Sequence, residues 1–518
     1  MKRLSLPLFL FFSGIGLKIG FSQNCSGFGS VFSGDSLYRY LQVLASDSLE
    51  GREAGQPGQR KAAHYLARHF GRLGCEPAGN DGFFQTFRLR QERIAKKNVS
   101  VGGIPWNFLK EYYHWPGLPA LKLEKKEIVF AGYGIRDEDS GYDNFMGYNV
   151  EGQVVMVLQD EPMLANGFSA ITGKEKLSDW SRSSRKKTDF LKSQRPAAIL
   201  MVARFFSDDL EKWGHYLEKT RIAREDKTFK YDDVPVLYIH PDQAEEILQR
   251  GGIASIDQWK EKYSKKKKTP CVKIPVEFSM EVAYKDTLLP TENVVAWWPG
   301  TDLSQEHVIL TAHYDHLGKN AEGTFYGADD DGSGTAALME IARVLRWAAD
   351  KGVRPRRSIL IMPVTAEEKG LLGSAYYTDY PRKPLSDAVA NLNIDMVGRR
   401  DARHAEGGDY VYIIGSHFLS QELHDINEEA NAGCAGLELD YSFNTLEDPN
   451  RLYFRSDHYN FALHKIPCIF YFSGLHEDYH ATTDTAEKID FSLLTRRTRL
   501  VFETLWRLAN RKDRPALN

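Results

Sequence analysis

Five short segments between residues 312 and 480 concentrate side chains that bind metal ions. They are residues 312–316, 328–334, 366–368, 393–395 and 478–480. Taken singly, a histidine at a strand end is usually structural, and an acidic turn is usually a helix cap. Clustered carboxylates, however, repel one another unless a cation neutralises them. If the five segments meet at one place in the fold, they indicate a metal site built from His, Asp and Glu.

Strands and helices alternate in this part of the sequence, which would bring the segments together. Apolar runs typical of strands lie at residues 308–311, 359–362, 392–394, 411–414 and 469–472, and helical spacing lies at 335–349 and 493–509. This alternation predicts an α/β fold with a mixed, largely parallel sheet flanked by helices. Each segment follows such a strand, and α/β proteins place their reactive groups at the carboxyl ends of strands.

The segments resemble the motifs of the co-catalytic di-zinc aminopeptidase family, which also contains glutamate carboxypeptidases and glutaminyl cyclases. The matching stretches, in chain order, are His313-Tyr-Asp315, Asp330-Asp-Gly-Ser-Gly334, Glu367-Glu368, Asn393-Ile-Asp395-Met-Val-Gly398 and Tyr479-His480-Ala-Thr-Thr-Asp484-Thr485. Their order and spacing match over about residues 290–490. Residues 44–55 are also similar to a segment near the start of bacterial members.

The resemblance implies two zinc ions and assigns their ligands. Asp330 would bridge the two ions, His313 and Asp395 would complete one site, and Glu368 and His480 would complete the other. Two imidazoles and three carboxylates suit zinc and leave each ion an open position.

The resemblance also implies three residues that act beside the metals. Asp315 would accept the free ring N–H of His313 and fix its tautomer. Glu367 would be the general base, which takes a proton from the attacking water and delivers it to the leaving amine. Tyr479 resembles the family residue that donates a hydrogen bond to the oxyanion, and plain packing is the alternative for it.

Two other metal-binding patterns overlap these segments. Residues 476–480 fit the His-Glu-x-x-His pattern, which requires a helix, but Ser473-Gly474 before it and three threonines after it favour a loop. Residues 329–340 fit a relaxed EF-hand loop, which requires an incoming helix. A glycine-rich approach stands there instead, so we expect a strand-to-helix turn that positions Asp330.

Changes in the pattern of apolar and polar residues along the chain predict four segments. Residues 1–22 form a signal peptide, 23–125 the amino-terminal part of the peptidase domain, 126–285 an insertion, and 286–518 the catalytic zinc peptidase domain. The insertion has β-rich texture and resembles the protease-associated domain often found in the family.

The first residues predict export. Lys2 and Arg3 precede an apolar run over residues 4–17, and small residues follow, with cleavage expected after Ser22. The run is too short for the roughly 20 apolar residues that span a bilayer. We therefore expect a periplasmic, cell-surface or secreted protein without stable membrane insertion after signal removal. A membrane anchor is the alternative.

Composition narrows the classes further. The 518 residues include 67 Lys+Arg and 70 Asp+Glu, which give a net charge of −3. This balance lacks the positive excess that is typical of nucleic-acid-binding proteins. The hydrophobic content of 42% is that of a globular protein. The five cysteines form no C-x-x-C pair, which disfavours a structural zinc knuckle. The sequence contains no G-x-S-x-G motif, which would have indicated a nucleophilic serine.

The resemblance implies a zinc-dependent aminopeptidase that removes amino-terminal residues from peptides, and the first residues of the chain predict that it is exported. A carboxypeptidase is the first alternative and would need a cation for the terminal carboxylate, for which Arg399, Arg400 and Arg455 are available. A glutaminyl cyclase would typically dispense with the second metal. An inactive receptor-like protein is the remaining alternative. The oligomeric state is not predicted.

Overall fold

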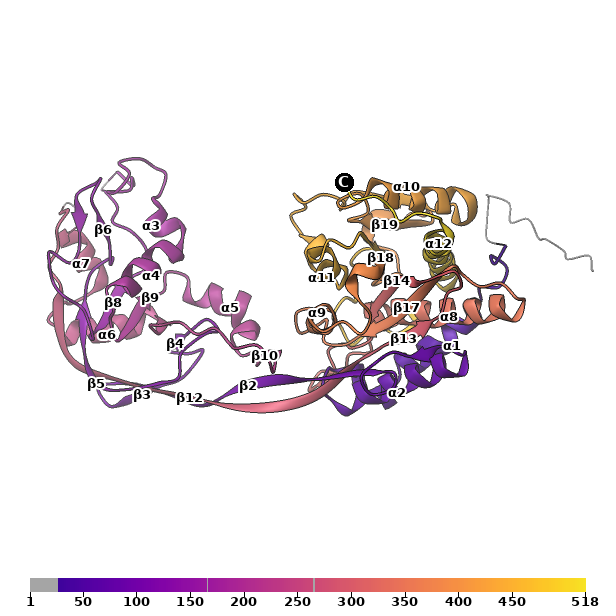
Figure 1. The fold of residues 1–518 in the computed structure, drawn as a ribbon. Helices are drawn as coiled ribbons and strands as arrows, with labels where there is room; N and C mark the ends of the chain where they lie inside the picture. Colours follow the sequence, from indigo (N-terminus) through magenta and orange to yellow (C-terminus); the bar gives the residue numbers. More distant parts are fainter. Residues whose placement is uncertain (1–26, 165, 264–265) are drawn as a thin grey trace, which may run out of the picture. The chain divides into compact units, whose positions relative to one another are not determined.

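The computed structural model describes residues 27–164, 166–263 and 266–518 and divides into two compact units (Figure 1). Unit 1 comprises the chain up to Arg88 together with Leu289–Asn518, and unit 2 comprises Leu89–Leu288. The predicted signal peptide, residues 1–22, lies outside the described residues. Within the described ranges, no helix has the length and apolar character needed to cross a membrane.

An eight-stranded sheet forms the centre of unit 1. Its order is β1 (Glu76–Pro77), β13 (Ala296–Trp298), β17 (Arg357–Val364), β14 (Leu303–His313), β18 (Ala388–Ile394), β21 (Cys468–Phe472), β19 (Tyr410–Ile414) and β20 (Glu438–Asp440). Strand β14 pairs in parallel with β17 and β18, and β18 pairs in parallel with β21. Strands β13 and β19 pair antiparallel with β17 and β21. The predicted α/β fold with a mixed, largely parallel sheet is confirmed.

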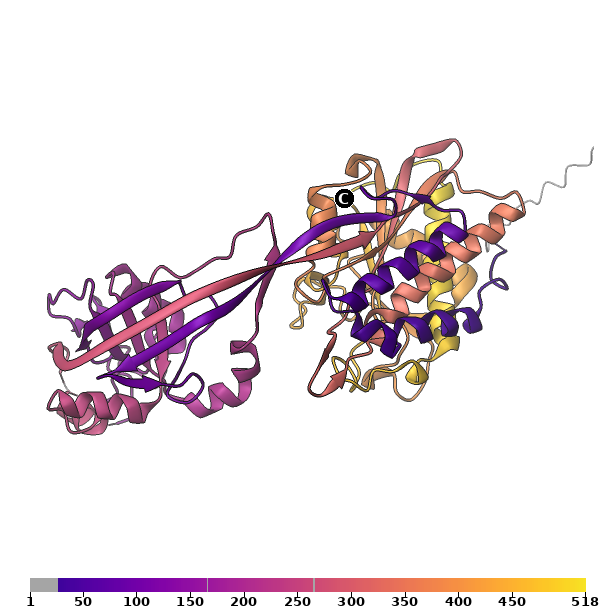
Figure 2. The same cartoon turned by 90° about the horizontal axis from the view of Figure 1, so that it is seen from below.

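Helices cover both faces of this sheet. One face carries α1 (Gly34–Leu44), α2 (Pro57–Arg72), α8 (Gly334–Asp350), α10 (Gln421–Ala430) and α12 (Phe491–Asn510). Figure 2 shows α1, α2 and α8 side by side on it. The other face carries α9 (Leu372–Asp379) and α11 (His458–Leu463). A hairpin of β15 (Lys319–Asn320) and β16 (Gly323–Thr324) follows β14.

Sequence explains where the longest of these helices begins and which side it buries. The Asp490 carboxylate accepts the Leu493 N–H at the start of α12, which satisfies one of the free donors of the first turn. Leu494, Val501 and Leu505 recur at helical spacing and are fully buried against the sheet.

Unit 2 is built on a nine-stranded sheet. Its order is β10 (Arg221–Arg224), β2 (Phe84–Val101), β12 (Val272–Val294), β5 (Leu121–Phe130), β8 (Val154–Leu158), β9 (Ala198–Val202), β11 (Val236–Ile239) and β4 (Tyr112–Tyr113), with β3 (Ile104–Trp106) paired to β2. A separate two-stranded sheet joins β6 (Arg136–Asp137) and β7 (Tyr142–Asp143). The helices are α3 (Asp179–Arg182), α4 (Ser184–Ser193), α5 (Phe206–Leu217), α6 (Pro241–Arg250) and α7 (Ile256–Tyr263).

The central strands of unit 2 are buried on both faces. In β8, Val154 and Met156 belong to one apolar cluster, and Val155 and Val157 belong to another. Alternate residues of a strand point to opposite faces, so each cluster is the core of one face. The continuous apolar runs by which these strands are recognised follow from this double burial.

The start of unit 2 differs from the predicted insertion, residues 126–285. Unit 2 begins at Leu89, because residues 89–92 of β2 pair with β10, and β3 and β4 also belong to its sheet. Residues 88–97 are rich in Arg, Lys and Glu and lack the apolar run that marks a buried strand. The apolar runs typical of strands therefore begin about 40 residues after the start of unit 2.

Candidate metal centre

The carboxyl edge of the unit 1 sheet carries the predicted site. Strand β14 ends at His313, and Asp395 directly follows β18. Glu367 and Glu368 come shortly after the end of β17. Since β17, β14 and β18 run parallel, their carboxyl ends meet at one edge.

Asp330 lies between two histidines. Its Oδ1 is 3.1 Å from Nε2 of His313, and its Oδ2 is 3.1 Å from Nε2 of His480. Each carboxylate oxygen thus faces a different imidazole. This is the arrangement that a carboxylate bridging two cations requires.

The other two predicted ligands complete the two sides. Asp395 Oδ1 lies 3.5 Å from Nε2 of His313, and Glu368 Oε2 lies 3.3 Å from Nε2 of His480. The structure therefore brings the other four predicted ligands around Asp330, with His313 and Asp395 on one side and Glu368 and His480 on the other.

A turn of buried acids holds Asp330 in place. Its own N–H and that of Asp329 donate to the Asp484 carboxylate. Asp329 Oδ1 accepts the N–H of Gly398 at 2.6 Å. Gly327 begins the turn at φ 53°, and a Cβ there would lie 2.2 Å from the Asp330 carbonyl oxygen. The turn therefore requires glycine at this position.

Asp331 is a buried residue for which no role was predicted. Its carboxylate accepts three backbone N–H groups, those of His313, Gly334 and Met396. These groups lie at the end of β14, the start of α8 and the residue after Asp395. Asp331 therefore fixes the segments that carry the ligands relative to one another. The sequence signal was its place in the acidic run, but its contacts are long-range.

Asp315 makes a different contact from the predicted one. The His313 Nδ1 lies 3.1 Å from the main-chain oxygen of Asp315, whereas the nearest carboxylate oxygen is 3.9 Å away. The ring proton is therefore held by the backbone. The Asp315 carboxylate instead accepts the N–H of Glu367 at 3.2 Å. Burial raises the pKa of Asp315 to about 7.

The Glu367 carboxylate faces the site and has no close partner within the described part of the chain. Its Oε2 is 3.9 Å from Nε2 of His313. Burial, together with the charge of neighbouring Glu368, holds the pKa of Glu367 well above its ordinary value. A raised pKa suits a group that must accept a proton and give it up again.

His316 joins the site although no role was predicted for it. It is fully buried, and its Nδ1 lies 2.9 Å from Glu368 Oε1 and 3.8 Å from Asp330 Oδ2. The ligand atoms of these three residues lie within 4.8 Å of one another, as do those of His313, Glu367 and Asp395. The signal for His316 was its place one residue beyond the His-x-Asp motif.

Tyr479 stacks on the ring of His480, with centroids 3.8 Å apart. Its hydroxyl lies 3.4 Å from Nη2 of Arg455. Both residues line a cavity of about 40 Å³ that opens onto the metal-ligand cluster. The rest of its wall is apolar and consists of Met396, Leu452, Phe470, Phe472 and Leu475.

The three arginines considered for a terminal carboxylate differ in their surroundings. Arg399 pairs with Asp478 at 3.0 Å, and Arg400 pairs with Asp409 at 2.8 Å. Arg455 alone of the three lines the cavity.

The two overlapping metal patterns resolve as expected from the sequence. Residues 473–485 form a loop after β21, and His476 Nε2 lies 3.2 Å from Asp329 Oδ2 rather than beside His480. The acidic turn leads into α8 and follows the β15–β16 hairpin, so no helix enters it as in an EF-hand.

The cluster has the chemistry of a site for divalent cations. Among the described residues, Asp315 Oδ2 and Nε2 of His316 are buried without a hydrogen-bond partner. Several carboxylates so close together are costly unless cations balance them. Imidazole and carboxylate donors suit zinc, so the residues present fit a pair of such ions.

Comparisons with known proteins find a family model that is similar to the part of the chain that carries this site. Residues 293–505 match the model described as "Peptidase family M28". Two curated relatives are the probable glutamate carboxypeptidase LAMP1 of Arabidopsis thaliana, 39% identical over 22% of this chain, and the aminopeptidase YwaD of Bacillus subtilis, 42% identical over 18%. The matches span 16% and 18% of the lengths of those relatives.

A solved structure shares the fold over nearly the whole chain. The aminopeptidase from Aneurinibacillus sp. strain AM-1 aligns with a TM-score of 0.54 and 17% sequence identity, covering 94% of this chain and 96% of its own.

Proposed function

We propose that residues 293–505, which match the model of peptidase family M28, make this chain a zinc-dependent aminopeptidase that removes amino-terminal residues from peptides. The observation that carries the proposal is the position of Asp330, whose two carboxylate oxygens each lie 3.1 Å from a different histidine. A second support is that curated relatives include an aminopeptidase.

His313, Asp330, Glu368, Asp395 and His480 would hold two zinc ions. Zinc bound there would polarise the peptide carbonyl and make water a better nucleophile near neutral pH. Asp484 keeps Asp330 in place by accepting its backbone N–H, and Asp331 accepts the backbone N–H of His313.

Glu367 takes the proton of the attacking water and returns it to the leaving amine. The raised pKa of Glu367 supports this role, because the residue must hold the proton between the two steps. Asp315 keeps Glu367 in position by accepting its backbone N–H. Tyr479, which lines the cavity, donates a hydrogen bond to the oxygen on which negative charge develops.

The apolar cavity wall would receive the first side chain of the substrate. Met396, Phe470 and Phe472 favour an aliphatic or aromatic group over a charged one.

Glu367→Gln tests the catalytic assignment. We expect kcat to fall by about 10² to 10⁴-fold while the zinc content stays unchanged, because the amide cannot accept the proton. Glu447→Gln, at an exposed site, is the matched control. Full activity in the Glu367 variant, or in enzyme stripped of zinc by a strong chelator, would refute the mechanism.

A carboxypeptidase is the second candidate, and one observation favours it. Arg455 lines the cavity and could hold a terminal carboxylate, whereas Arg399 and Arg400 are paired with acids. Peptides with free and acetylated amino termini distinguish the two. Acetylation should block an aminopeptidase and spare a carboxypeptidase.

The two remaining alternatives have less support. A glutaminyl cyclase would hold one zinc per chain, so a measured stoichiometry near two would exclude it. A receptor-like protein would lack turnover altogether, although this chain keeps all five predicted ligands and Glu367.

Export and the nature of unit 2 belong to the same proposal. The basic and apolar residues of segment 1–22 support a cleaved signal. Mass spectrometry of the mature amino terminus tests it, with residue 23 expected first. We also propose that unit 2 is a protease-associated domain.

A further inference from the structure

One edge of β2 in unit 2 is open between two short partner strands. Strand β10 pairs with residues 89–92 of β2, and β3 pairs with residues 99–101. Strand β12 lies along the opposite edge. In the described part of the chain, no strand pairs with residues 93–98 on the open edge. At about 3.3 Å per residue, this edge is roughly 20 Å long.

Backbone groups of known direction face this open edge. The N–H of Gly102 donates to the carbonyl oxygen of Glu277 on the β12 side. Because successive residues of a strand alternate, the N–H and C=O groups of Arg93, Ala95 and Lys97 point to the opposite, open side. A row of such groups is a template for pairing with another strand.

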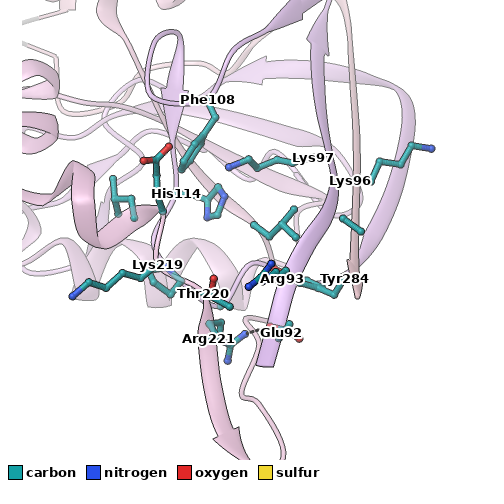
Figure 3. Close-up of a pocket in the computed structure, with 16 residues that line it drawn as sticks. Glu92, Arg93, Lys96, Lys97, Phe108, His114, Lys219, Thr220, Arg221 and Tyr284 are labelled. Atoms are coloured by element: carbon teal, nitrogen blue, oxygen red, sulfur yellow. Dashed lines mark hydrogen bonds and ion pairs between the residues drawn. The ribbon is translucent and has the colours of Figure 1, made fainter. Parts of the chain in front are cut away.

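A cavity of about 340 Å³ lies beside the same residues, within the size range of ligand pockets. Figure 3 shows the side chain of Lys97 directed toward Phe108 and His114, whereas that of Lys96 points away. The Lys97 ammonium lies over the ring of Phe108. Apolar surface from Phe108 and Leu217 completes the cavity wall.

The cavity has more cations than its own acids can balance. Lys96 pairs with Glu281, and Arg221 pairs with Glu92, so these two cations are already balanced. Arg93, Lys97 and Lys219 also line the cavity, and among the described residues none of them has an ion-pair partner. Glu218 is the remaining acid of the cavity wall. Burial lowers the pKa of Lys97 to about 8, so its ammonium is partly desolvated yet still mainly charged at neutral pH.

His114 adds an acceptor to the cavity. The side chain is 3% exposed, and its Nδ1 lies 3.0 Å from the carbonyl oxygen of Trp115, so Nδ1 carries the proton. Its Nε2 has no hydrogen-bond partner among the described residues. Burial lowers the pKa of His114 to about 4, which keeps the ring neutral and Nε2 free to accept.

We propose that the open edge of β2 at residues 93–98 binds an extended acidic peptide by strand addition. A polypeptide is the ligand whose own row of N–H and C=O groups matches this edge. Acidic side chains complement Arg93, Lys97 and Lys219. The proposal concerns unit 2 by itself and does not depend on the peptidase activity.

Binding of two blocked peptides to the full chain tests the proposal. One alternates Glu and Val over about eight residues, and the other alternates Lys and Val. Both are acetylated and amidated, so that neither terminus contributes charge. By calorimetry at low salt, the Glu peptide should bind at least tenfold more tightly than the Lys peptide, and its affinity should fall as salt is added. Equal binding of the two peptides, or no binding of the Glu peptide, would overturn the proposal.

Two pairs of variants separate the charge from the edge. Lys97→Glu should lower the affinity for the Glu peptide at least tenfold. Lys174→Glu, at an exposed site away from the cavity, should leave this affinity unchanged. Ala95→Pro removes an N–H from the open edge and should also weaken binding at least tenfold, whereas Ala95→Val keeps that group and should retain it. Circular dichroism checks that the Ala95 variants fold.

Other outcomes would count against the proposal. Unchanged affinity in Lys97→Glu excludes charge recognition, and unchanged affinity in a folded Ala95→Pro chain excludes strand addition. Association of the protein with itself through this edge, seen by sedimentation and lost in Ala95→Pro, would identify a second copy as the occupant instead.

Discussion

The Ser456 hydroxyl donates a hydrogen bond of 2.6 Å to Oδ2 of Asp395, and both residues are buried. The other carboxylate oxygen of Asp395 is thereby left facing His313. Ser456 is itself held by the side-chain amide of Asn393 on β18. A residue that does not touch the metal position thus decides which oxygen of Asp395 is presented to it.

Ser456→Ala should weaken zinc binding by about 10 to 100-fold, the usual effect of removing a partner of a metal ligand. The zinc content remaining at increasing chelator concentration measures this. Ser442→Ala is the matched control, since that hydroxyl bonds Asp440 at an exposed position. Equal zinc retention by the two variants would contradict the role given to Ser456.

Tyr479→Phe should lower kcat by about 10² to 10³-fold, because the variant loses a hydrogen bond that forms fully only in the transition state. Zinc content and KM should change little. Steady-state kinetics on a short peptide measures both constants. Tyr216→Phe, at an exposed site in unit 2, should behave as wild type. A rise in KM with kcat unchanged would reduce Tyr479 to a packing residue.

Arg52 should be among the most important single residues for stability. Its buried guanidinium donates to the carbonyl oxygens of Tyr314, Tyr326 and Gly327, which flank the ligand-bearing segments. Arg52→Met removes these hydrogen bonds, and we expect the free energy of unfolding, measured in urea, to fall by about 3 to 5 kcal/mol. In the control variant Arg68→Met, at an exposed site, the free energy of unfolding should fall by less than about 0.5 kcal/mol. A similar small loss in both would contradict the prediction.

His307 should make the protein sensitive to acid. It is fully buried beside Trp297, and burial lowers its pKa to about 4. The unfolded chain titrates near 6.5, so the contribution of His307 is fully present above that pH and is lost as the pH falls toward 4. At about 1.4 kcal/mol per pKa unit, the loss reaches roughly 3 kcal/mol.

His307→Phe should remove this part of the acid sensitivity. Urea unfolding at several pH values between 7 and 4 measures the difference from wild type. His215→Phe, at an exposed site, should keep the wild-type profile. If the His307 variant loses as much stability on acidification as the wild type, burial of the neutral ring is not the cause.

Much of the site could be predicted from local patterns. The apolar runs at 308–311 and 392–394 mark the cores of β14 and β18, and the polar residues after them carry the ligands. Parallel strands bring such residues to one edge whatever the details of the loops. His313 and Asp395 could therefore be placed together from the sequence, and the resemblance to the di-zinc aminopeptidase family added Asp330.

The contacts of the surrounding residues could not be predicted in this way. Asp331, Ser456 and His316 act through partners many positions away, and which backbone group an acid accepts depends on loop geometry. The same limit explains Asp315, whose carboxylate bonds the Glu367 backbone rather than a ring. The start of unit 2 was missed because β2 is a strand of charged residues.

The chain passes into unit 2 along β2 and returns along β12, its neighbour in the sheet. Without unit 2 in place, bringing the two ends of a segment of about 200 residues together costs roughly 5 kcal/mol of loop-closure entropy. Once unit 2 has folded, that cost no longer opposes unit 1, whose two sequence portions then start side by side. We therefore expect unit 2 to fold before unit 1. Destabilising substitutions in unit 2 should then delay formation of the metal centre in unit 1, although they lie outside that unit.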